Sequence, residues 1–234
     1  MNDRNASIPC LRLCAKGGVE LRIALTVVLA AAGLVFAAPA PADPTVNGPT
    51  GTCPPACNRI PDSAWISPSA IPLDARYGWQ PLAGLAVTAR VPRFRFEELC
   101  GSAPAPQDPR TYAVAERSVI THPDGQWQLQ AQIVHWQGET WRGGELARGA
   151  MAAAAASLRA CQLTNPGASP SITLEEPDRL AAVISGPVIL HQYLLADPVS
   201  STVTELALWA AAPPAAPYQT VSDATVLEAL GAPL

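Results

Sequence analysis

Two stretches near the middle of the chain are predicted to be β-strands, and the second alternates apolar and polar side chains. Residues 111–121 and 126–136 flank Pro123-Asp124-Gly125, and all three of these residue types favour a tight turn. In the second stretch the apolar positions 127, 129, 131 and 133 alternate with glutamines at 126, 128, 130 and 132. This pattern predicts an antiparallel hairpin whose apolar face packs on the domain and whose glutamine face meets water.

A long helix is predicted directly after the hairpin, over residues 140–163. Thr140 is a suitable N-cap, the run Met151–Ala156 has high helix propensity, and Asn165-Pro166-Gly167 ends the pattern. Small and apolar residues recur every three or four positions along it, which forms one stripe that faces the sheet: Leu146, Ala150, Ala153, Ala154, Ser157, Leu158 and Cys161.

The rest of the chain predicts further strands and two short helical segments. Strands are expected at 85–91, 172–175, 180–184, 187–196 and 202–211, a helical turn at 94–100, and a last helix at 223–230 that Ser222 caps. Strands joined by tight turns are antiparallel. The fold class is therefore α+β: a mainly antiparallel sheet with one long Ala-rich helix packed on one face, and a short C-terminal helix expected on the same face.

The first 42 residues have the pattern of a secretory signal peptide. Residues 23–38 carry no charge, Lys16 and Arg22 precede them, and Ala40-Pro41-Ala42 supplies small residues for cleavage. The apolar run is shorter than the roughly 20 residues that a membrane-spanning helix needs. An uncleaved N-terminal anchor is the alternative and would be the only membrane attachment. Val19 is an alternative start of translation.

The chain that remains after cleavage behind Ala42 is expected to consist of an arm and one domain. Residues 43–84 are rich in Pro, Gly, Ser and Asp and predict an irregular arm, with Trp65, Tyr77 and Trp79 packing it onto the domain. Residues 85–234 are expected to form a single α+β domain.

Four cysteines follow the signal peptide: Cys53, Cys57, Cys100 and Cys161. An even number in an exported chain predicts disulfides, because that compartment is oxidising. Of the three possible pairings we favour Cys53–Cys57 with Cys100–Cys161. The three histidines are not spaced as metal ligands, so neither a metal nor another cofactor is expected.

The charge of the exported part argues against nucleic acid as a partner. Residues 43–234 hold eleven arginines, no lysine and seventeen acidic residues. A chain with this net negative charge repels polyanions, so it is not expected to bind nucleic acid. The one basic cluster, Arg90, Arg93 and Arg95, is interpreted as an exposed strand edge.

Candidate chemistry is sparse, because no Gly-x-Ser-x-Gly or phosphate-binding loop occurs in the chain. His135, Trp136 and Trp141 flank the connection from the hairpin to the long helix, so they are the candidate ligand-binding residues. The Gly143-Gly144 pair could bring backbone N–H groups close to an anion. His191 lies in the middle of a predicted strand.

The order of elements from Gln126 to Ala211 resembles the PknH-like extracellular sensor domain. The hairpin, the Ala-rich helix with Cys161 and the following strands carry this resemblance. The leader, the abundance of Ala and Pro and the loss of lysine resemble exported actinobacterial proteins. The resemblance implies a ligand-sensing cleft and no catalysis.

These observations favour a secreted, periplasmic or cell-wall protein that binds an envelope ligand or protein without catalysis. One alternative is an envelope hydrolase with a site near His135 or His191, which requires a carboxylate or hydroxyl group within hydrogen-bond reach inside a cleft. Another is a structural protein that binds its partner through a flat apolar patch.

Overall fold

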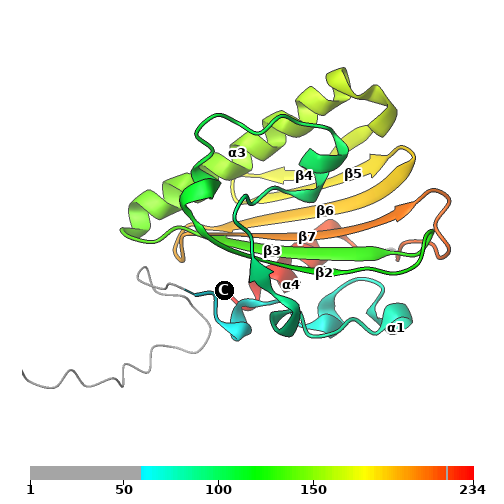
Figure 1. Ribbon diagram of the computed structural model, residues 1–234, viewed down its shortest axis with the longest axis horizontal. Helices are drawn as coiled ribbons and strands as arrows, with labels where there is room; N and C mark the ends of the chain where they lie inside the picture. The colour runs from blue at the N-terminus through cyan, green and yellow to red at the C-terminus, as the bar shows by residue number, and fades with distance from the viewer. Residues whose placement is uncertain (1–58, 220) are drawn as a thin grey trace, which may run out of the picture. The chain divides into compact units, whose positions relative to one another are not determined.

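A seven-stranded antiparallel sheet organises the computed structural model, which describes residues 59–219 and 221–234 (Figure 1). The strand order is β1-β2-β3-β7-β6-β5-β4. The strands are β1 (Val87–Thr88), β2 (Val114–Ile120), β3 (Gln128–His135), β4 (Pro170–Glu176), β5 (Arg179–Ser185), β6 (Val188–Asp197) and β7 (Thr202–Ala211). The predicted α+β class is confirmed. The predicted signal peptide and the Cys53–Cys57 bond lie outside the described residues.

The predicted hairpin and the later strands meet at the centre of the sheet. β3 pairs with β2 on one side, where Arg117 lies opposite Gln132, and with β7 on the other, where Glu205 lies opposite the same Gln132. The long helix α3 (Thr140–Thr164) follows β3 along the chain, and the next strand, β4, lies at the far edge. The chain then returns strand by strand until β7 reaches β3.

The helix α3 lies across one face of the sheet, as predicted (Figure 1). It buries a stripe of mostly small side chains that lets it approach the strands closely: Ala147, Ala150, Met151, Ala154, Ala155, Leu158 and Cys161. The predicted stripe is corrected in part, because Ala153 is exposed and Leu146 and Ser157 are only half-buried. The short helix α2 (Arg95–Leu99) packs on the same face. The predicted Cys100–Cys161 disulfide is confirmed and ties the end of α2 to α3. The N-cap of α3 is Glu139 and not Thr140, a shift of one residue.

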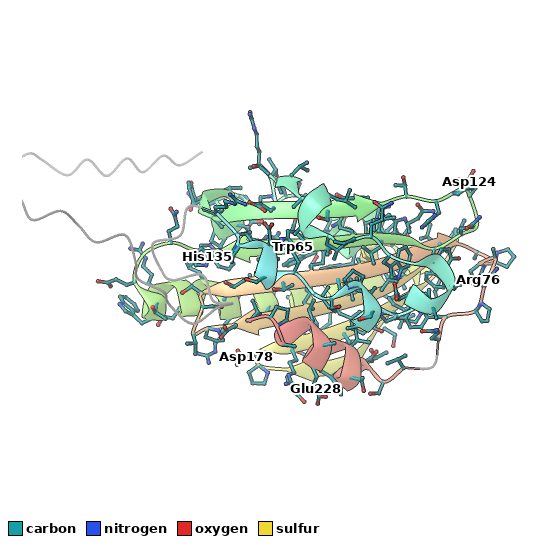
Figure 2. The ribbon with its side chains drawn as sticks, turned by 90° about the horizontal axis from the view of Figure 1, so that it is seen from below. Trp65, Arg76, Asp124, His135, Asp178 and Glu228 are labelled. Atoms are coloured by element: carbon teal, nitrogen blue, oxygen red, sulfur yellow. A yellow bond between two sulfur atoms is a disulfide. The ribbon has the colours of Figure 1, made fainter. Side chains whose placement is uncertain are left out.

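The C-terminal helix α4 (Asp223–Gly231) covers the opposite face, so the expectation of both helices on one face is wrong. It shares that face with α1 (Asp74–Tyr77) and the 3₁₀ turns at Asp62–Ala64, Pro68–Ala70 and Ala83–Leu85 (Figures 1 and 2). Trp65 and Trp79 are buried in this second core, as predicted. Apolar side chains from the segment before β1 therefore complete the domain.

The glutamine face of β3 is buried, which corrects the expectation that it meets water. Gln132 is fully buried and Gln130 is only 3% exposed. The face is covered because α2 packs over it, and the backbone N–H of Phe96 donates to Gln192 Oε1 on β6, which lies beyond β7 in the sheet (3.2 Å). The alternation correctly predicted the strand but not what covers each side of it.

Candidate functional site

The predicted ligand-binding region contains a cleft of about 770 Å³ at the start of α3. We call it the wide cleft. It lies between the loop before β2 and the connection from β3 to α3, and its lining residues are Gln107, Pro109, Tyr112, Trp136, Gln137, Gly138, Glu139, Arg142, Gly143 and Leu146. This volume falls within the range of about 300–1,000 Å³ that is typical of small-molecule sites.

Close backbone packing positions the start of α3 beside this cleft. A Cβ atom on Gly143 would lie 2.3 Å from Ser201 Oγ, and one on Gly144 would lie 2.7 Å from the carbonyl oxygen of Pro198. The Ser201 carbonyl also accepts a hydrogen bond from the Trp136 backbone N–H (3.0 Å). The Gly143-Gly144 pair is thus explained by its packing against the turn between β6 and β7.

A buried ion-pair cluster holds the loop that forms the other wall. Arg110, which is 8% exposed, donates to Glu97 Oε1 (2.9 Å) and Asp108 Oδ2 (2.6 Å), and its guanidinium lies over the Phe94 ring. Burial alone would raise the pKa of Asp108, but the hydrogen bonds and charge of Arg110 lower it overall. Both carboxylates are therefore fully engaged by one guanidinium.

The same loop borders a second, narrower cleft of about 260 Å³ against α3. We call it the narrow cleft. Its walls are mostly apolar and built from small residues: Ala103, Ala105, Pro106, Pro109, Gly149, Ala150, Ala153 and Ala154, with Gln107, Ser157 and the three charged residues of the Arg110 cluster. Gln107 and Pro109 line both clefts and stand between them.

The three predicted ligand-binding residues occupy different environments. Trp136 lines the wide cleft but is 3% exposed, and its indole N–H donates to the Pro109 carbonyl (3.0 Å). Trp141 is 64% exposed, lies outside the cleft lining and donates to Glu139 Oε2 (2.6 Å). His135 is 1% exposed and does not line the cleft. The structure brings only Trp136 into the concave site.

His135 is the last residue of β3, so it lies at the end of the strand that is far from the hairpin turn containing Asp124 (Figure 2). Its Nδ1 is 3.0 Å from the Ser200 carbonyl oxygen and 3.3 Å from Thr202 Oγ1. Burial lowers the pKa of His135, although the Ser200 hydrogen bond opposes this shift. A hydroxyl group is therefore within reach, as the hydrolase alternative requires, but the ring is closed off from solvent.

His191 belongs to an aromatic cluster on the α4 face of the sheet. Its ring stacks on Tyr218 with a centroid separation of 3.5 Å, and Trp127 lies 5.8 Å away. The Tyr218 hydroxyl is 3.0 Å from the Tyr193 hydroxyl. Burial lowers the pKa of His191 to about 4, and the charge of Asp223 only partly opposes this. A neutral, stacked ring of this kind packs the two layers together.

A buried carboxylate that the sequence analysis did not single out lies beneath α2. Glu205 is fully buried, and it accepts hydrogen bonds from the Arg95 backbone N–H (2.5 Å), Gln130 Nε2 (3.0 Å) and Gln192 Nε2 (3.1 Å). Burial raises the pKa of Glu205 to about 7 despite these donors and the charge of Arg117. The burial of the glutamine face is thus compensated by a hydrogen-bonded network.

Two members of the basic cluster, Arg93 and Arg95, contact other residues of the domain and do not form an exposed strand edge. Arg93 donates to the backbone carbonyls of Glu97 and Ser102, while the Arg95 guanidinium pairs with Glu98 and lies 4.3 Å from the centre of the Trp209 ring. Both guanidinium groups are half-buried and make their contacts within the domain. This corrects the interpretation made from the sequence.

Tyr112, Arg142 and Leu146 also line the wide cleft but were not among the predicted ligand-binding residues. Tyr112 is 81% exposed in the turn Pro109–Tyr112, and in the sequence the position of an aromatic residue shortly after a proline-rich loop was an available signal. Arg142 and Leu146 lie one helical turn apart on α3, so their place beside that loop depends on tertiary structure.

Comparisons with protein-family models, with curated proteins and with solved structures found no match. Within the described residues, no set of three or more His, Cys, Asp or Glu side chains is grouped to hold a metal ion. None of the helices in that part of the chain combines the length and apolar character of a membrane-spanning segment.

Proposed function

We propose that this chain is an exported protein that binds a small ligand in the wide cleft without catalysing a reaction on it. The observation that carries the proposal is the cleft itself, which has a suitable volume and mixes apolar walls with polar groups. Its concave shape favours a ligand over the flat surface that a purely structural protein would present.

Export to the cell envelope or the medium is the second part of the proposal. It rests on the leader pattern over residues 1–42 and on the Cys100–Cys161 disulfide, because such bonds persist in oxidising compartments. The predicted similarity to the PknH-like sensor domain agrees with a ligand-binding role.

The test is an NMR titration with 8-anilinonaphthalene-1-sulfonate, whose rings suit Leu146 and Tyr112 and whose sulfonate suits Arg142. The proposal predicts that the amide signals of Gly138 and Gly143, which line the wide cleft, shift on addition of the probe. The amide signals of Gly78 and Gly125, which lie in distant turns, should not shift. Shifts confined to those distant glycines, or no shift at all, would contradict the proposal.

A matched pair of variants sharpens this test. Tyr112→Ala removes an aromatic wall and should weaken probe binding about fivefold, because an aromatic contact contributes about 1 kcal/mol. Val199→Ala is the control, since Val199 is also 81% exposed but does not line the cleft. Equal affinities of the two variants would place the probe elsewhere.

A further inference from the structure

The narrow cleft and the wide cleft lie on two sides of one short piece of chain, Gln107 to Pro109. The narrow cleft, at about 260 Å³, is smaller than the sites that usually hold a whole small molecule. The wide cleft, at about 770 Å³, is within that range. A ligand that occupied both would have one slender part and one larger or more polar part.

The chemistry of the narrow cleft suits a slender apolar group. Its α3 wall is made of Gly149 and alanine methyl groups, and its loop wall is made of alanine and proline. The charged residues at its border, Glu97, Asp108 and Arg110, are paired with one another. One guanidinium serves two carboxylates, so the cluster keeps a net negative charge that disfavours an anionic group, and apolar contact is the main attraction in the narrow cleft.

The wide cleft adds an available positive charge. Arg142 is exposed and makes no side-chain hydrogen bond or ion pair within residues 59–219 and 221–234. The nearby carboxylate of Glu139 accepts the Trp141 indole N–H (2.6 Å). An anionic group placed in the wide cleft would meet the Arg142 guanidinium, and a guanidinium is the group best suited to bind a carboxylate or phosphate.

We propose that the ligand is an amphiphile with a single alkyl chain and an anionic head group. The alkyl chain occupies the narrow cleft between α3 and the loop 103–109, and the head group occupies the wide cleft beside Arg142. This inference rests on the proposed function, because it names the class of ligand for the same site and extends that site to the narrow cleft.

The test compares dodecanoate, below its micelle concentration, with butanoate in NMR titrations of the full domain. Gly149 reports on the narrow cleft, and Gly138 and Gly143 report on the wide cleft. Dodecanoate should shift all three amides and bind at least tenfold more tightly than butanoate. Butanoate should shift only the wide-cleft glycines. Equal affinities, or dodecanoate binding without a shift of Gly149, would overturn the inference.

Two alanines of α3 provide a matched pair of variants. Both Ala153 and Ala156 are exposed, but only Ala153 lines the narrow cleft. Ala153→Leu should fill this cleft and weaken dodecanoate binding at least tenfold while butanoate binding stays unchanged. Ala156→Leu should leave both affinities at the wild-type value. Equal effects of the two variants on dodecanoate would contradict an alkyl chain in the narrow cleft.

The head group has its own variant and its own outcome. Arg142→Gln should weaken dodecanoate and butanoate by the same factor, at least threefold, because it removes the charge that both ligands use. If anilinonaphthalene sulfonate binds at Gly138 and Gly143 but dodecanoate does not reach Gly149, the ligand class is wrong and the wide-cleft function stands. If neither compound shifts any of these glycines, both proposals fail.

Discussion

Adding one methyl group to either of two glycines in α3 should change the stability of the domain in opposite directions. Gly144 and Gly149 lie five residues apart in the same helix. A Cβ atom at Gly144 would lie 2.7 Å from the Pro198 carbonyl oxygen and 3.1 Å from Pro198 Cβ, whereas one at Gly149 would meet nothing within 4 Å. Intrinsic helix propensity favours Ala over Gly at both positions.

The size of each effect follows from these contacts. Gly149→Ala gains only the propensity difference, so the free energy of unfolding should rise by about 1 kcal/mol. Gly144→Ala must displace backbone atoms of the β6–β7 turn, which should outweigh that gain and lower the free energy of unfolding by about 1–3 kcal/mol. The turn cannot yield easily, because Asp197 accepts backbone hydrogen bonds from Val199 and Ser200.

Urea unfolding followed by circular dichroism measures both changes, and calorimetry gives the shift in Tm. For a chain of this length, 1 kcal/mol corresponds to about 2–4 °C. A neutral or stabilising Gly144→Ala variant would refute the reasoning, since the start of α3 could then not lie against Pro198. The position of the wide-cleft wall that the start of α3 forms would then be wrong as well.

Three further predictions concern buried charges and the disulfide. The free energy of unfolding of the wild-type protein should fall by about 3 kcal/mol between pH 4.5 and 7.5, because the Glu205 carboxyl, with its pKa raised to about 7, stays protonated in the folded state while the unfolded carboxyl ionises. Glu205→Gln should abolish this fall, and urea unfolding of both proteins across this pH range measures the difference. Arg110→Met should lower the free energy of unfolding by about 3–5 kcal/mol, because it leaves the buried carboxylate of Glu97 and the half-buried carboxylate of Asp108 without their cation. A loss below 1 kcal/mol in the same assay would contradict the cluster. Replacing Cys100 and Cys161 together by Ser should cost about 4 kcal/mol, as expected for opening a loop of 61 residues, and unchanged stability of this variant under oxidising conditions would show that the bond does not form.

Local pattern was sufficient to predict most elements of the fold. The alternation in β3, the alanine run of α3 and the Ser222 cap of α4 each depend on neighbouring residues, and each appears where it was expected. The Cys100–Cys161 pairing could also be predicted, because Cys161 lies on the stripe of α3 that faces the domain.

The burial of the glutamine face could not be predicted in this way. Its cover comes from α2, which is more than 30 residues away in sequence, and Glu205 completes the network from β7, which pairs with β3 but is about 70 residues away along the chain. Periodicity tells which side chains share a face of a strand, but not which remote segment packs on that face.

The candidate site could be predicted only in part, because one of its walls also comes from a remote segment of the chain. The connection between β3 and α3 was the right region, and Trp136 does line the wide cleft. The opposite wall comes from Gln107, Pro109 and Tyr112, which the Arg110 cluster holds in place. No spacing in the sequence reveals that cluster, because it joins α2 to a proline-rich loop through side chains.

Native mass spectrometry of the protein secreted by its own cell tests the central claim most directly. The secreted chain is expected to begin at Asp43 and to carry a small molecule, which is lost on unfolding. A Tyr112→Ala variant should retain less of that molecule, and a Val199→Ala variant should retain the wild-type amount. A chain that keeps residues upstream of Ile23, or a secreted protein that carries no small molecule at any stage of native purification, would contradict the account.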